Sequence, residues 1–212
     1  MIFALLPVKS PRNAKQRLNG LLSAGEREGL ARLMYERTLA ELCQASGIDQ
    51  VVVITSDPEI AEHARRSNVL VFEETEQQSH SASADGACLR AIELGATTVL
   101  LVPIDVPLVT RADFERLARA AGRGVVIVPS ADGTGTNALA RTPPDVIESR
   151  FGPSSFRLHS ELAHARGVPA EVLRLPGLMF DIDTPSDVAE LLERAPASHV
   201  VASFLRSACA SK

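Results

Sequence analysis

Three aspartates lie at positions where packing alone does not account for a carboxylate. Asp105 follows an apolar run that is typical of a strand, and an unpaired buried carboxylate is costly. Asp181 and Asp183 are two residues apart in an extended segment, so their side chains point to the same face. Two carboxylates held together repel each other unless a cation or a proton lies between them. The aspartates therefore predict a site for Mg²⁺, which proteins bind through carboxylates together with substrate phosphates.

Simpler interpretations of the same aspartates stay open. Asp105 could be a turn residue that accepts hydrogen bonds from nearby N–H groups. Asp183 could be a turn residue beside a helix start, with Thr184 as the cap and Pro185 as the first helical residue. That helix start explains Thr184 and Pro185 but leaves Asp181 unexplained.

A cluster of cations follows the first apolar run, directly after Pro7. The cluster lies in one short loop and consists of Lys9, Arg12, Lys15 and Arg17. The loop has neither the G-x-G-x-x-G pattern of dinucleotide folds nor the G-x-x-x-x-G-K-[ST] pattern of a P-loop. Ammonium and guanidinium groups can neutralise a triphosphate during phosphoryl transfer, which is the chemistry we expect here. A solvated basic surface loop is the alternative.

Two polar segments could bind a second substrate. Residues 132–137 (DGTGTN) combine glycines and threonines, so the backbone can approach a ligand closely and donate hydrogen bonds from amides and hydroxyls. Residues 151–156 (FGPSSF) open a predicted helix, where an anion could dock on Ser155 and the neighbouring amides. A surface loop and a serine cap are the alternatives. His159 follows on this helix and is expected to face the site, whereas the other histidines are expected at the surface.

The elements that must position these residues alternate along the chain. Apolar runs predict strands at 2–7, 50–55, 69–72, 98–103, 125–129 and 171–175, and amphipathic or capped runs predict helices at 23–46, 58–66, 85–94, 111–121, 155–166 and after Thr184-Pro185. Such alternation indicates an α/β fold with a mostly parallel sheet covered by helices on both faces. Ligands bind such sheets outside the carboxyl ends of the strands. We expect no further strand between Pro129 and Pro153, and region 130–180 is interpreted as an appendage that forms part of the site.

Composition excludes several classes of protein. The chain has 212 residues, 45% hydrophobic and 23% charged residues, no Trp, one Tyr and a net charge of −4. Because nucleic-acid binders are usually basic or rich in stacking aromatics, nucleic acid is not an expected partner. Neither a membrane span nor a signal peptide is predicted, since the first cations follow the apolar run rather than precede it. Three widely spaced cysteines fit a reducing cytoplasm.

One domain is expected over residues 1–197, with a C-terminal tail over 198–212 that forms a short helix.

Five motifs follow one another along most of residues 2–193: P-V-K-x₅-K-x-R-L, I-D-V-P-L, G-T-G-T-N-A-L, F-G-P-S-S-F-x-x-H and P-G-L-x-x-D-I-D-T-P. Taken in this order, they resemble the guanylyltransferases of coenzyme F420 biosynthesis, which use 2-phospho-L-lactate, phosphoenolpyruvate or 3-phospho-D-glycerate. The resemblance implies a three-layer sandwich of the nucleotide-diphospho-sugar transferase (GT-A-like) type.

The resemblance also implies roles for individual residues. The metal carboxylates fall on Asp105, Asp181 and Asp183, which are expected to bind two Mg²⁺ ions. Lys9, Lys15, Arg17 and Asp105 are the expected catalytic residues, and the expected nucleotide-binding set is Pro7, Lys9, Lys15, Arg17 and Asp85. The acceptor-binding positions fall on Thr136, Asn137, Gly152 and Ser155. Residues 83–87 (SADGA) depart from the G-L-N pattern of many relatives, a region expected near the guanine or the acceptor.

The expected reaction is transfer of GMP from GTP to a small phospho-acid with release of pyrophosphate. Two alternatives remain at this point: a nucleotidyltransferase of the molybdopterin type, and a catalytically silent nucleotide-binding module. The sequence does not decide which phospho-acid is the acceptor. A homodimer and functional coupling to the downstream transferase of the F420 pathway stay open as well.

Overall fold

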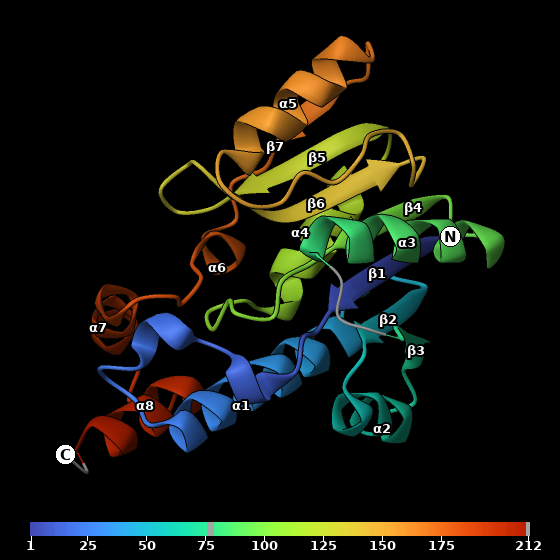
Figure 1. The fold of residues 1–212 in the computed structure, drawn as a ribbon. Coiled ribbons are helices and arrows are strands. Elements are labelled where there is room, and N and C mark those ends of the chain that lie inside the picture. The colour runs from blue at the N-terminus through green and yellow to red at the C-terminus, as the bar shows by residue number, and fades with distance from the viewer. Residues whose placement is uncertain (76–78, 211–212) are drawn as a thin grey trace.

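The computed structural model describes residues 1–75 and 79–210, and Figure 1 shows their arrangement. The strands of the sheet are β1 (Ile2–Pro7), β2 (Gln50–Thr55), β3 (Leu70–Glu73), β4 (Thr98–Leu101), β5 (Gly124–Pro129), β6 (Thr136–Thr142) and β7 (Ala170–Val172). The α-helices are α1 (Ala24–Cys43), α2 (Pro58–Arg66), α3 (His80–Glu93), α4 (Arg111–Ala120), α5 (Ser155–Ala165), α6 (Pro176–Met179), α7 (Pro185–Arg194) and α8 (Val200–Ala210). Two short 3₁₀ helices, Pro11–Asn13 and Gln16–Leu18, lie in the basic loop after β1.

The strands form one seven-stranded sheet in the order β3-β2-β1-β4-β6-β5-β7. All pairings are parallel except those of β6, which runs antiparallel to both β4 and β5. The expectation that no strand lies between Pro129 and Pro153 is therefore wrong, because β6 occupies an interior position of the sheet. Arg141 interrupts the apolar pattern of this strand, so the sequence does not indicate a strand there. Its charged side chain occupies a core position and is only 1% exposed. Asp85 compensates its charge, with 3.0 Å between Nη1 and Oδ1.

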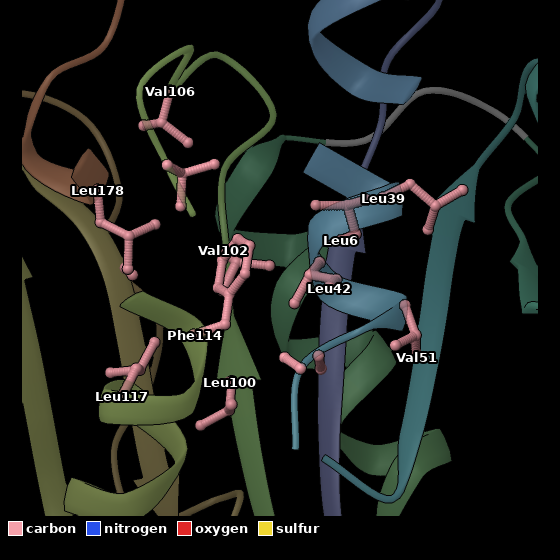
Figure 2. Packing of buried hydrophobic residues seen from close by; sticks show 14 of the residues in the cluster. Leu6, Leu39, Leu42, Val51, Leu100, Val102, Val106, Phe114, Leu117 and Leu178 are labelled. Atoms are coloured by element: carbon pink, nitrogen blue, oxygen red, sulfur yellow. The ribbon is translucent and has the colours of Figure 1, made fainter. Parts of the chain in front are cut away.

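Side chains alternate between the two faces of the sheet and create two cores, as the pleat of a strand requires. On one face, residues of β1, β4 and β6 pack against α1 and α4; Figure 2 shows this cluster with Leu39 and Leu42 from α1 beside Phe114 and Leu117 from α4. On the other face, a second cluster packs α3 and α5 against the sheet. The expected layered α/β sandwich is confirmed. Each fully buried Leu or Phe contributes about 1.5–3 kcal/mol to its stability.

A third cluster joins both ends of the chain away from the sheet. Residues of α1, α7 and α8 pack together there, and Val201, Ala202 and Leu205 of α8 are fully buried. Figure 1 shows α8 beside α1, below the sheet. The segment after residue 197 thus forms a helix that belongs to the packed core. Within residues 1–75 and 79–210, no helix combines the length and the apolar character that a membrane crossing requires.

Local caps explain where the helices start. Ser23 and Glu26 form the expected capping box of α1, and Thr184 and Asp187 form another at the start of α7. Helix α3 starts at His80, five residues before the expected position 85, because Ser79 accepts a hydrogen bond from the amide of Ala82 at 3.2 Å. Asp85 therefore lies inside the helix rather than at its start.

Candidate active site

Three strands place chemically suited residues at one edge of the sheet. Lys9 follows the carboxyl end of β1, and Asp105 follows that of β4. Because β6 runs antiparallel, its first residues, Thr136 and Asn137, lie at the same edge. Ligands of open α/β sheets bind outside the carboxyl ends of the strands, so this edge is the candidate site.

The predicted acidic residues meet there. Asp105, Asp181 and Asp183 each offer a carboxylate oxygen, and these oxygens lie within 4.8 Å of one another. A backbone hydrogen bond from Ile182 N to Asp105 O, 3.0 Å long, joins the segment of Asp181 and Asp183 to the segment after β4. Ile182 itself is fully buried, so the aspartates on either side of it point the opposite way, as the extended spacing predicts.

Lys15 binds two of these carboxylates. Its Nζ atom lies 2.9 Å from Asp105 Oδ2 and 3.0 Å from Asp183 Oδ1. Burial opposes the charge of Lys15, but the attraction of the two carboxylates outweighs it and raises the pKa of the ammonium group. The same pairing outweighs burial at Asp105 and lowers the pKa of that carboxyl group. Lys15 has a positive φ of 52°, so the backbone bends sharply where it delivers this side chain.

Asp181 is held differently from the other two aspartates. Asn137 Nδ2 donates to Asp181 Oδ1 at 3.1 Å and also to the carbonyls of Leu178 and Met179 at 2.9 and 3.1 Å. Burial, together with the negative charge of Asp105, raises the pKa of Asp181. The carboxylate thus lacks the cationic partner that its neighbours share. Asn137, expected to bind the acceptor, uses its amide nitrogen to orient Asp181.

The donor set fits a magnesium ion. Three converging carboxylate oxygens are hard ligands, which is the type that Mg²⁺ prefers, and all three residues keep part of their surface accessible. Lys15 brings one positive charge, which Asp105 and Asp183 share, so the three carboxylates retain negative charge for a cation.

Two cavities meet at these aspartates. The first, about 290 Å³, is lined by the basic loop and is called the cation-side cavity; its lining includes Pro7, Lys9, Asn13 and Lys15. The second, about 760 Å³, is called the hydroxyl-side cavity; its lining includes Ser130, Thr136, Asn137, Gly152 and Ser155. Both are lined by His80, Pro103, Asp105 and Asp183. Molecules bound in the two cavities would meet over the carboxylates.

The four cations of the basic loop separate in space. Lys9 and Lys15 line the cation-side cavity. Arg17 lines the hydroxyl-side cavity instead and lies 3.8 Å from Asp183, with 75% of its side chain exposed. Arg12 pairs with Glu59 at 3.2 Å and lines neither cavity. The cation-side cavity therefore receives ammonium groups rather than guanidinium groups from this loop.

The predicted acceptor-binding residues form the wall of the hydroxyl-side cavity. Ser155 is 1% exposed, and its Oγ accepts a hydrogen bond from the amide of Thr136 at 2.8 Å. The idea that Ser155 caps α5 is wrong, because Ser154 occupies the cap position and makes no cap bond with its side chain. Gly152 has a φ of +121°, a backbone conformation that favours glycine over every other residue.

His159 does not face the cavity, contrary to expectation. The ring is fully buried between Thr136 Oγ1, 3.0 Å from Nδ1, and the amide of Arg150, 2.9 Å from Nε2. Burial, helped by the charge of Arg141, lowers the pKa of His159 to about 4. The ring is therefore neutral at physiological pH.

Asp85 lies outside both cavities. Its carboxylate accepts hydrogen bonds from the amide of Ser149, 3.1 Å from each carboxylate oxygen, and from the Ser149 hydroxyl at 2.7 Å, besides its pair with Arg141. These bonds fix the loop that precedes Phe151. Nucleotide binding by Asp85 stays a prediction that no contact in the described residues supports.

His80 is not at the surface, where the sequence places it. It lines both cavities, and its ring lies edge-on to Phe151, with 4.6 Å between the ring centroids. Burial, together with the charge of Lys9, lowers the pKa of His80, although the negative charge of Asp105 opposes this shift. The only sequence signal was the serine-rich run 79–83, which caps and starts α3 earlier than its apolar pattern indicates.

Comparison with known proteins finds one family along nearly the whole chain. The profile of the family described as "Guanylyl transferase CofC like" matches residues 2–209. A phosphoenolpyruvate guanylyltransferase from Conexibacter woesei is 38% identical over 90% of this chain and 87% of its own length. A 2-phospho-L-lactate guanylyltransferase from Methanothermobacter thermautotrophicus is 32% identical over 92% of this chain and 86% of its own.

One solved structure shows the same fold. A protein from Desulfovibrio desulfuricans G20, whose function as a nucleotide-diphospho-sugar transferase is itself inferred, superposes with a TM-score of 0.79. The match covers 97% of this chain and 94% of that one at 16% identity. The expected fold class is confirmed.

Proposed function

The chain belongs to the CofC-like guanylyl transferase family, and we propose that it transfers GMP from GTP to phosphoenolpyruvate. The choice of acceptor is supported by identity. Of the two relatives described above, the one named for phosphoenolpyruvate shares 38% of the aligned residues with this chain, against 32% for the one named for 2-phospho-L-lactate.

The observation that carries the proposed mechanism is the meeting of two cavities over one acidic cluster. We place the GTP triphosphate in the cation-side cavity, where Lys9 and Lys15 oppose its charge. An ammonium group has three N–H donors, and Lys15 uses two on Asp105 and Asp183, so one is left for a phosphate oxygen. The phospho-acid occupies the hydroxyl-side cavity, with its phosphate directed at the cluster.

The reaction forms one bond and breaks one. An oxygen of the acceptor phosphate attacks the α-phosphorus of GTP. The bond from the α-phosphorus to the bridging oxygen breaks, and that oxygen leaves with its electron pair on pyrophosphate. No protein nucleophile is needed, because the chain holds the two substrates in line and neutralises their charge.

Asp105, Asp181 and Asp183 would bind Mg²⁺, with two ions expected. When bound, the metal would neutralise the charge that develops on the reacting phosphates. Asn137 would keep Asp181 aimed at the same point, since its amide ties the carboxylate to the α6 carbonyls. The chain's free cysteines, Cys43, Cys88 and Cys209, support a cytoplasmic location.

Competition between acceptors tests this function. The purified protein with GTP and Mg²⁺ is given equal concentrations of phosphoenolpyruvate, 2-phospho-L-lactate and 3-phospho-D-glycerate, and the products are separated by mass. We expect the guanosine diphospho-adduct of phosphoenolpyruvate in excess, with one pyrophosphate released per adduct. Replacing GTP with CTP or ATP is the control for the base. An adduct that forms mainly with another acid would overturn the proposed acceptor, and no adduct from GTP would overturn the activity.

A further inference from the structure

His159 carries its proton on a nitrogen that the structure identifies. The backbone amide of Arg150 donates to Nε2 at 2.9 Å, and an N–H donor requires a lone pair on the atom it meets. In a neutral imidazole one nitrogen has the lone pair and the other has the proton. Nδ1 therefore carries the proton and donates it to Thr136 Oγ1, 3.0 Å away. The lowered pKa of His159 agrees with a neutral ring.

This bond determines what the Thr136 hydroxyl can do. Since Oγ1 accepts from His159, its own proton must be donated to something else. The Ser155 hydroxyl also has its proton left to donate, because its Oγ accepts a hydrogen bond from the amide of Thr136 at 2.8 Å. For both hydroxyls, the structure shows no acceptor among residues 1–75 and 79–210. Both residues line the hydroxyl-side cavity.

Neighbouring hydroxyls of the same wall show the contrast. Ser130 Oγ donates to Asp132 Oδ1 at 2.6 Å, and Thr134 Oγ1 donates to Asp132 Oδ2 at 2.8 Å. Their protons are already used by a carboxylate of the chain. Ser130 and Thr134 therefore donate their protons within the protein, whereas Thr136 and Ser155 can donate theirs to a ligand.

We propose that His159 is a positioning residue that fixes the Thr136 hydroxyl as a donor, so that Thr136 and Ser155 together bind the carboxylate of the acceptor. The inference rests on the proposed function, which places a phospho-acid in this cavity. A carboxylate only accepts hydrogen bonds, so two committed donors match it. The phosphate of the same molecule is then left to face the acidic cluster and GTP. If His159 had no such role, it would only fill the core and support the turn at Arg150.

Two substitutions separate these roles. The amide nitrogen of His159→Asn can take the place of Nδ1, so this variant keeps a donor for Thr136 but loses the acceptor for Arg150. The amide oxygen of His159→Gln can reach the place of Nε2, so this variant keeps the acceptor for Arg150 but loses the donor. Thr136→Val removes the hydroxyl while keeping the shape of the side chain.

Steady-state kinetics with GTP and phosphoenolpyruvate give the decisive comparison. We expect His159→Gln to raise the acceptor KM about tenfold, the effect of losing one oriented hydrogen bond to an ion, with the GTP KM unchanged. His159→Asn should stay within about threefold of the wild type. In the Thr136→Val background, His159→Gln should have no further effect on the acceptor KM, because the residue through which it acts is gone. Equal increases in both variants, or effects that multiply in the double variant, would overturn the proposal.

A second measurement does not depend on activity. Nitrogen-15 NMR of histidine-labelled protein reports which ring nitrogen carries the proton, and the His159 signal is assigned by its loss in His159→Gln or, should that variant not fold, in His159→Asn. We expect the proton on Nδ1; a proton on Nε2 would overturn the inference. If the wild-type protein forms no adduct from GTP while Nδ1 is protonated, the proposed function has failed rather than the hydrogen-bond assignment.

Discussion

The two cavities that meet at the acidic cluster are built on different principles. The cation-side cavity takes its binding groups from one irregular loop, where Lys9 and Lys15 offer full charges on long side chains. The hydroxyl-side cavity, which Arg17 also lines, has neutral groups from β6 and α5: Ser155 is hydrogen-bonded to Thr136, and Thr136 to the buried His159. The first can attract any polyphosphate, whereas the second can discriminate between small acids, because fixed donors reject groups that cannot accept.

The carboxylates shared by both cavities should give the largest effect. Asp183→Asn keeps the size of the side chain but removes a charge from the cluster. We expect turnover to fall by at least ~10²-fold, since electrostatic groups at a reacting centre typically contribute that much. Steady-state kinetics over a range of Mg²⁺ concentrations measures it. The matched control is Glu193→Gln on the exposed side of α7, which should change nothing; near-normal activity of Asp183→Asn at low Mg²⁺ would contradict the metal site.

The cation-side cavity is tested by Lys15→Ala. Removing the ammonium group should raise the GTP KM between tenfold and a hundredfold. The acceptor KM should stay nearly unchanged, because Lys15 lines the cation-side cavity and not the hydroxyl-side cavity. Arg12→Ala removes a cation from the same loop whose guanidinium pairs with Glu59, so it serves as the control and should have little effect. A rise in the acceptor KM with an unchanged GTP KM would show that the loop binds the other substrate.

The buried histidine of the hydroxyl-side cavity predicts a dependence of stability on pH. The pKa of His159 is about 4 in the folded protein, below the ordinary value near 6.5, so the unfolded chain binds a proton that the folded chain rejects. The neutral ring therefore contributes its full stabilisation at pH values above 6.5, and this contribution is lost as the pH falls toward 4. Between pH 7 and pH 5 the loss in the free energy of unfolding is about 2 kcal/mol. The charge of Arg141 opposes protonation of His159 and that of Asp85 favours it, and a substitution of His159 leaves both residues in place.

Chemical denaturation at the two pH values measures this term. The free energy of unfolding of the wild type should fall by about 2 kcal/mol more than that of His159→Gln between pH 7 and pH 5. Other titrating groups, His80 among them, are common to both proteins and cancel. An identical pH dependence in both would show that His159 titrates normally.

Of the three substitutions tested here by kinetics, Ser155→Ala should give the smallest effect. The acceptor KM should rise about tenfold with an unchanged GTP KM, and the free energy of unfolding should fall by about 1–3 kcal/mol because the buried amide of Thr136 loses its acceptor. Ser154→Ala is the control one residue earlier, since its hydroxyl makes no cap bond. Substrate titrations and thermal unfolding of both variants provide the comparison. An unchanged acceptor KM in Ser155→Ala would leave Ser155 a purely structural role.

The parallel part of the fold could be predicted from the sequence because its strands are uninterrupted apolar runs. The bounds of β1 and β2 agree with the prediction to the residue. The antiparallel strand β6 could not be predicted, since Arg141 interrupts its apolar pattern and only the contact with Asp85 explains that charge. The early start of α3 was missed for a similar reason, because its first turn is polar and depends on Ser79.

The site likewise has residues that the sequence predicts and residues whose contacts only the folded structure shows. The acidic cluster could be predicted because charged residues directly after strands meet at a known edge of the sheet. The role of His159 could not, because it depends on two contacts, with Thr136 and with Arg150, that only folding creates. His80 could not be placed, because the serine-rich run 79–83 indicates where α3 starts but not that His80 lines both cavities.

Isotope transfer tests most directly whether an oxygen of the acceptor phosphate attacks the α-phosphorus of GTP. Phosphoenolpyruvate with oxygen-18 in the non-bridging positions of its phosphate is incubated with GTP and the protein, and both products are analysed by mass. If an acceptor oxygen attacks the α-phosphorus, all of the label must appear in the guanosine adduct and none in the pyrophosphate. Label in the pyrophosphate would contradict this mechanism, because it would mean that the acceptor phosphate becomes part of the leaving group.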